Sequence, residues 1–177
     1  VTATVLVWHH GGDAVRPAFR YAVYHLLGGV LVIAGVVLHF TNTGTFAYGA
    51  GFTDGLPTTL AVLGVGLNLG FVGLHYWVPD TYPRPHVAAS VVLAGFTTKV
   101  AVYVMLRLVP DGHALVAWMG GAMILYGVWM ALLQTDARRL LSYHIVSQVG
   151  YMTAAVGIGT AAGTAGAVAH LSTHVLY

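Results

Sequence analysis

Long runs of apolar residues, separated by short polar or proline-rich segments, dominate the pattern of this chain of 177 residues. A helix that crosses a membrane needs about 20 mostly apolar residues, and six stretches reach or approach that length. The pattern therefore predicts six transmembrane helices, over Val15–Phe40, Pro57–Val78, His86–Leu108, His113–Gln134, Leu140–Gly159 and from Gly163 to the end of the chain.

The first fourteen residues differ from the rest, because a short apolar stretch, VTATVLVW, leads into a polar loop. We interpret residues 1–14 as the end of a preceding helix plus a loop, and residues 15–177 as part of a membrane domain. The adjacent His9 and His10 fit a solvated loop better than a metal site, since no further ligand follows nearby.

Composition agrees with a membrane location for the whole chain. Hydrophobic residues make up 58% of the sequence and charged residues 7%, with a mean hydropathy of +0.79, whereas soluble domains carry about 25% charged residues. We therefore expect an all-α, polytopic protein with the lipid bilayer as a partner. The absence of cysteine excludes disulfides and thiolate metal sites. No basic cluster exceeds Arg138-Arg139, so no nucleic-acid partner is expected.

The arginines predict an orientation. If all six stretches cross, one face of the membrane keeps only Arg107, and the other collects Arg16, Arg20, Arg84, Arg138 and Arg139. Because cytoplasmic loops carry the excess of positive charge, the face with five arginines is predicted to be cytoplasmic.

The second stretch contains Gly64, Gly66, Gly70 and Gly73, with Asn68 among them. Glycine weakens a helix, so this stretch could break where it is buried in protein or lines a hydrated cavity. Small residues also let two membrane helices pack closely. Both interpretations stay open at this point.

Lys99, the only lysine in the sequence, lies in the middle of the third stretch. A helix rises about 1.5 Å per residue, which places Lys99 roughly 18 Å beyond Val87, near mid-membrane. A charge at this depth is costly and is by default a candidate for function. Thr97 and Thr98 beside it favour a polar interior surface.

Seven histidines lie in or beside the predicted spans: His25, His39, His75, His86, His144, His170 and His174. His170 and His174 share one helix face because they are four residues apart, as do His144 and Gln148. Three interpretations are open, namely a proton relay with Lys99, ligands of a haem or metal, and hydrogen-bonded core residues. Histidine suits a relay since it titrates near neutral pH.

Three segments carry a family resemblance: LHYWVPDTYPRPHVAASVVLAGFTTKVAVYVMLR (74–107), LLQTDARRLLSYHIVSQVGYM (132–152) and AHLSTHVLY (169–177). They resemble the proton-translocating antiporter-like membrane subunits that multisubunit sodium/proton antiporters share with respiratory complex I. The most similar branch is the D subunit of the Mrp-type antiporter. The resemblance implies that this chain is roughly a third of a subunit with about 14 helices in two inverted repeats.

The resemblance also implies which residues act, because buried lysines, histidines and a glutamate carry protons at mid-membrane in that family. The matching positions here are Lys99, His144, His170 and His174. Asn68 stands where the family usually carries a second buried lysine, and the paired glutamate would precede residue 1. We assign Asn68 and Gln148 a weaker role in a polar path or a helix break.

These observations predict a membrane subunit that translocates protons within a multisubunit sodium/proton antiporter, with other subunits as partners. The alternative is a proton-pumping membrane subunit of an NADH:quinone oxidoreductase, in which case the chain is part of an enzyme. A haem-binding membrane protein and a purely structural subunit are further possibilities. No cofactor and no metal site are expected, and no carboxylate at mid-span suggests a sodium site.

Overall fold

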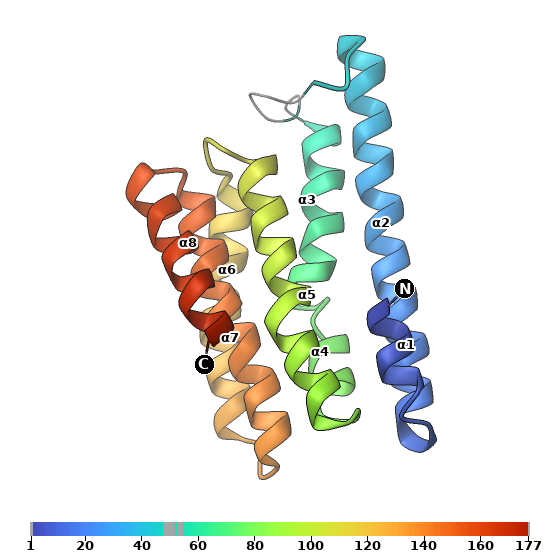
Figure 1. Ribbon diagram of the computed structural model, residues 1–177. Helices are drawn as coiled ribbons and strands as arrows, with labels where there is room; N and C mark the ends of the chain where they lie inside the picture. Colours follow the sequence, from blue (N-terminus) through green and yellow to red (C-terminus); the bar gives the residue numbers. More distant parts are fainter. Residues whose placement is uncertain (1, 48–51, 53–54, 177) are drawn as a thin grey trace.

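The computed structural model describes residues 2–47, 52 and 55–176, which form a bundle of helices without a strand in the described part (Figure 1). This confirms the predicted all-α class. The elements are α1 (Thr2–Trp8), the short 3₁₀ helix η1 (Gly12–Ala14), α2 (Val15–Thr43), α3 (Leu56–Leu69), α4 (Trp77–Thr81), α5 (Val87–Leu108), α6 (Ala114–Leu132), α7 (Ala137–Ile158) and α8 (Ala161–Leu176).

Each predicted span corresponds to a helix, but the helices differ in length. In the described part of the chain, three segments are long and apolar enough to cross a membrane: Gly12–Thr43, Val87–Leu108 and Ala114–Leu132. Of the others, α7 has 22 residues, α8 has 16 and α3 has 14. In the predicted loop between α2 and α3, residues 48–51 and 53–54 lie outside the described residues.

The second predicted span is broken after α3. Gly70 ends the helix in the left-handed conformation, with φ of 82°, which glycine adopts without steric cost. The amides of Gly70 and Phe71 both donate to the carbonyl of Gly66, at 2.9 and 3.0 Å. The indole of Trp77 donates to the Leu67 carbonyl at 2.8 Å. Trp77 thereby pairs a backbone group that the break leaves without its helical partner.

Glycines also bring helices into close contact, so both interpretations of the glycine-rich stretch apply. A Cβ atom at Gly64 of α3 would lie 2.5 Å from the Gly28 carbonyl of α2, and one at Gly127 of α6 would lie 2.6 Å from the Ser147 amide of α7. No side chain fits at such distances. The α2–α3 and α6–α7 pairs consequently form the most extensive helix contacts of the bundle.

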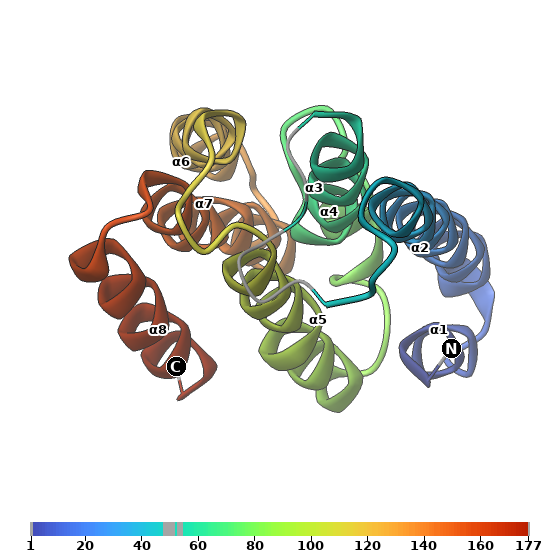
Figure 2. The ribbon, with the colours of Figure 1, turned by 90° about the horizontal axis from the view of Figure 1, so that it is seen from above.

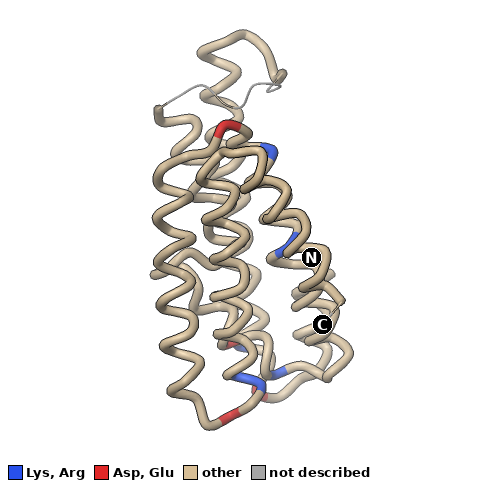
Figure 3. Tube along the Cα trace, turned by 90° about the vertical axis from the view of Figure 1, so that its left-hand side faces the viewer, with Lys and Arg blue, Asp and Glu red and all other residues tan. Residues whose placement is uncertain are grey.

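Helix α5 lies centrally among these pairs, as the view along the helices shows (Figure 2). It contacts α1, α3, α7 and α8, so a side chain on α5 can face several neighbours. Charged residues gather near the two ends of the bundle (Figure 3). Lys99 lies near the middle of α5, which runs from Val87 to Leu108. We call the end that carries Arg20, Arg84 and Arg138 the arginine end.

Candidate functional site

The side chain of Lys99 is held inside the bundle. Its residue is 3% exposed, and its Nζ donates to the Ala94 carbonyl, about one turn earlier on α5, at 2.7 Å. No carboxylate in the described part of the chain forms an ion pair with it. The sequence could not show this partner: the cation donates a hydrogen bond to a neutral carbonyl. An ammonium group in this setting is costly to bury.

Two histidines of α8 interact electrostatically with Lys99 of α5. The rings of His170 and His174 are 6.0 Å apart between centroids, as expected for side chains on one helix face. Both histidines are close enough to Lys99 to interact with it electrostatically. The Tyr151 ring of α7 packs edge-on against His170 at 6.2 Å. The structure thus brings α8 histidines and the α5 lysine into one group.

His144 joins this group from α7. It interacts electrostatically with His174, and its Nε2 lies 3.3 Å from Nε2 of Gln148, one turn further along α7. Electrostatic interactions therefore link the four predicted residues Lys99, His144, His170 and His174, which belong to three helices that contact one another pairwise. Gln148 supports this cluster through His144.

Asn68 lies apart from this cluster, at the α2–α3 contact. Its Nδ2 donates to the Gly64 carbonyl at 3.4 Å, and its buried Oδ1 has no hydrogen-bond partner among the described residues. An unsatisfied buried oxygen is uncommon and calls for an explanation. Asn68 precedes the helix break by two residues, so its oxygen lies where the backbone leaves the helical path.

A second polar cluster, which the sequence did not single out as a site, forms just after the break. His75 is 1% exposed, and its Nε2 lies 3.1 Å from the hydroxyl of Tyr126 on α6. Tyr143 of α7 packs near both rings, at 6.3 Å from His75 and 6.5 Å from Tyr126. A histidine directly after a glycine-rich break was the sequence signal that could have revealed it.

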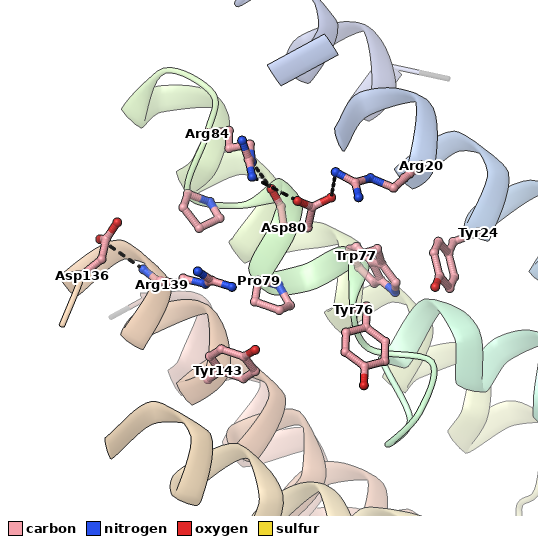
Figure 4. Close-up of a pocket in the computed structure, with 11 residues that line it drawn as sticks. Arg20, Tyr24, Tyr76, Trp77, Pro79, Asp80, Arg84, Asp136, Arg139 and Tyr143 are labelled. Carbon is pink, nitrogen blue, oxygen red and sulfur yellow. Dashed lines mark hydrogen bonds and ion pairs between the residues drawn. The ribbon is translucent and has the colours of Figure 1, made fainter. Parts of the chain in front are cut away.

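A cleft of about 600 Å³ opens at the arginine end between α2, α4 and α7 (Figure 4). Asp80 of α4 lies between two arginines there, with Arg20 at 2.9 Å and Arg84 at 3.3 Å. Tyr76 and Tyr143 line the cleft, and His75 stacks on Tyr76 at 4.6 Å. The cleft therefore reaches the aromatic side chains around the second polar cluster.

The segment between α4 and α5 is fixed by side-chain hydrogen bonds. Arg138, in the first turn of α7, donates through Nη2 to the Pro85 carbonyl at 2.8 Å and to Ser90 Oγ at 2.7 Å. Ser90 Oγ in turn donates to the Tyr82 carbonyl at 2.7 Å. Burial raises the pKa of the Tyr82 phenol, so this hydroxyl stays protonated and donates to the Leu93 carbonyl at 3.2 Å.

In residues 2–47, 52 and 55–176, no group of three or more histidine or acidic side chains is placed to hold a metal ion. The helical histidine pair His170 and His174 supplies two ligands, fewer than a structural site requires.

Comparison with known proteins gives the family. Residues 2–177 match the family described as NADH:quinone oxidoreductase/Mrp antiporter, TM. The D subunit of the Na(+)/H(+) antiporter of Alkalihalophilus pseudofirmus is 31% identical over 180 residues, which cover 92% of this chain and 36% of that protein. The M subunit of the NADH-quinone oxidoreductase of Escherichia coli is 30% identical over 197 residues, which cover 97% of this chain and 39% of that protein.

Solved structures share the fold. The Mrp complex from Dietzia sp. contains a chain that superposes with a TM-score of 0.91 at 22% identity, covering 99% of this chain and 36% of that one. A chain of respiratory complex I from Thermus thermophilus superposes with a TM-score of 0.84 at 24% identity, covering 99% of this chain and 42% of that one. The chain thus spans well under half the length of these relatives. Together with its apolar helices, the match over residues 2–177 shows that the chain belongs to the NADH:quinone oxidoreductase/Mrp antiporter transmembrane family, as a multi-pass membrane protein.

Proposed function

We propose that this chain is part of a membrane subunit that carries protons through the cluster of Lys99, His144, His170 and His174 within a multisubunit cation/proton antiporter. The observation that carries the proposal is the buried Lys99, which is 3% exposed and has no carboxylate partner in the described residues. Ionisable residues inside membrane spans typically mark ion pathways. The relative named as an Na(+)/H(+) antiporter subunit supports the class of complex.

Electrostatic coupling provides the working principle of the cluster. Lys99 and His174 are close enough to interact, so a proton on one disfavours a proton on the other, and the pair titrates as a unit. Loss of a proton from Lys99 then favours uptake of the next one at His174. A proton can move stepwise along the cluster in this way, since histidine exchanges protons near neutral pH.

The orientation of the protein follows from the arginines. Arg20, Arg84 and Arg138 lie at one end of the bundle, joined to Asp80 or to the segment between α4 and α5. The positive-inside rule assigns this end to the cytoplasmic side of the cell membrane. The loop around Asp13 belongs to the same side in this arrangement, because Arg84 donates to the Asp13 carbonyl at 3.4 Å.

Proton transport by the complete complex in vesicles tests the proposal. We expect Lys99→Ala to reduce the dissipation of a pH gradient to background. Lys99→Arg should also be inactive, because the arginine side chain keeps its proton at neutral pH. Arg107→Gln removes a cation at the other end of the same helix and should transport normally. Normal transport by Lys99→Ala, in a complex that assembles fully, would refute the proposal.

A second candidate function rests on the 30% identity to the M subunit of an NADH-quinone oxidoreductase. The same cluster would then carry protons driven by electron transfer in other subunits. Purification of the complex from its native membrane distinguishes the two. Proton pumping on addition of NADH and a quinone favours the oxidoreductase, and pH-gradient dissipation on addition of sodium, without redox activity, favours the antiporter.

A further inference from the structure

The cleft of about 600 Å³ at the arginine end has a surplus of positive charge. Three arginines line it, Arg20 of α2, Arg84 after α4 and Arg139 of α7, together with the two aspartates Asp80 and Asp136. Asp80 is shared between Arg20 and Arg84, so one carboxylate faces two guanidinium groups. Asp136 accepts backbone amides in the first turn of α7 and forms no ion pair with the described residues. The arginines of the cleft thus outnumber its aspartates.

Two of these arginines have guanidinium donors to spare. The Arg139 side chain has no hydrogen bond or ion pair within the described part of the chain, and it extends from α7 toward Pro79 of α4 (Figure 4). Arg20 binds Asp80 through Nη2 alone, and 56% of its side chain is exposed. Arg84 is already bonded to backbone carbonyls and contributes mainly its charge. Because a guanidinium fork binds phosphate oxygens in pairs, this set of donors suits a phosphate group.

A layer of tyrosines lies below the charged layer of the cleft. Each tyrosine is four residues from a charged lining residue and further from the arginine end: Tyr24 after Arg20, Tyr143 after Arg139 and Tyr76 before Asp80. Tyrosine is enriched where headgroups meet the hydrocarbon core, because its ring is apolar and its hydroxyl is a donor. The cleft therefore changes from cationic to amphipathic within about one helical turn, in the direction of the membrane interior.

We propose that this cleft binds the headgroup phosphate of an anionic phospholipid, with Arg139 and Arg20 as its direct contacts. The acyl chains follow α2 past Leu27, which is 51% exposed and lies three residues beyond Tyr24 on the same helix face. This apolar surface favours a lipid over free phosphate, which has no hydrocarbon part. Basic pockets between membrane helices on the cytoplasmic side bind such headgroups. The supply of anionic lipid rests on the orientation proposed above, whereas the binding site is independent of proton transport.

Photocrosslinking in the complete complex tests the site. The purified complex, depleted of lipid in detergent, is mixed with a phosphatidylglycerol that carries a diazirine on its headgroup, and crosslinked peptides are identified by mass spectrometry. We expect crosslinks within residues 20–24, 76–84 and 136–143, which unlabelled phosphatidylglycerol prevents and phosphatidylcholine does not. Arg139→Gln should raise the lipid concentration for half-maximal crosslinking about fivefold, the factor for one cationic contact with an anionic lipid surface. Arg16→Gln, at an exposed position of α2 outside the cleft, should leave that concentration unchanged.

Further arms separate the lipid from other anions. Arg139→Lys keeps the charge and should crosslink more strongly than Arg139→Gln. Absence of crosslinks in the three segments, equal competition by phosphatidylcholine, or the same response in Arg139→Gln and Arg16→Gln would each overturn the inference. Full protection by inorganic phosphate at the concentration of the lipid would assign the cleft to a soluble anion, and crosslinks that appear only after another subunit is removed would assign it to a protein partner. If Lys99→Ala transports normally while the crosslinks form, the proposed function fails and the lipid site stands.

Discussion

Two cationic regions of this chain contrast in how their charges are partnered. At the arginine end, Arg20 and Arg84 bind the same carboxylate, Asp80, and their side chains are 56% and 41% exposed. Inside the bundle, Lys99 is 3% exposed and binds a carbonyl oxygen. The aspartates that the structure describes, at positions 13, 80, 111 and 136, all lie outside the long helices.

The contrast separates two uses of charge. Exposed ion pairs are solvated and contribute little stability individually, so the arginine end serves chiefly to join loops and helix ends. A buried cation without a carboxylate opposes folding and is retained where a site needs it. Residues that lower the stability of the fold are expected at functional sites. Lys99 is the clearest such residue in the described chain.

The largest effect outside Lys99 is expected at His174. His174→Gln keeps a polar side chain of similar length but cannot exchange a proton, so transport should fall about tenfold, equivalent to ~1.4 kcal/mol in the barrier. The measurement is the initial rate of pH-gradient dissipation in vesicles that contain the assembled complex. His86→Gln, at the start of α5 and outside the cluster, is the control. Equal rates in both variants would mean that the interior cluster does not work as a unit.

An intermediate effect is expected at Arg138, which connects the two regions. Arg138→Gln loses the bonds to the Pro85 carbonyl and Ser90 Oγ, and partners left without a hydrogen bond cost roughly 1–3 kcal/mol. The thermal midpoint of the assembled complex should fall accordingly. Arg139→Gln removes the same charge from the neighbouring position, which takes no part in these bonds, and its midpoint should be unchanged. A similar loss in both variants would assign the effect to net charge.

The smallest effect is expected at Asp80. Asp80→Asn removes both ion pairs of the arginine end, yet exposed pairs are worth roughly 0–1 kcal/mol each. Transport should stay within about twofold of the wild type, and the thermal midpoint should shift less than in Arg138→Gln. Asp111→Asn, at the opposite end and in no ion pair with the described residues, provides the comparison. Loss of transport in Asp80→Asn alone would give the arginine end a direct role in proton entry.

The sequence by itself determined the helical class, the approximate bounds of the helices and the identity of the principal candidate. Apolar length sufficed for the helices because a bilayer imposes a fixed span and requires internal backbone hydrogen bonding. Lys99 stood out for a related reason, since a charge is rare inside such a stretch. The motifs around Trp77 and His144 indicated the family, which the comparisons confirmed.

Only the tertiary structure decided which polar residues meet. His144, His170 and Lys99 belong to three helices, and their convergence depends on how α5, α7 and α8 cross, which periodicity along one helix does not encode. The pairing of His75 with Tyr126 spans 51 residues, and the bond from Trp77 to Leu67 exists only because the backbone breaks at Gly70. Hydrophobic burial selects a helix face, but close packing at glycines such as Gly64 and Gly127 sets the distances between helices, and those distances determine where cavities and polar clusters form.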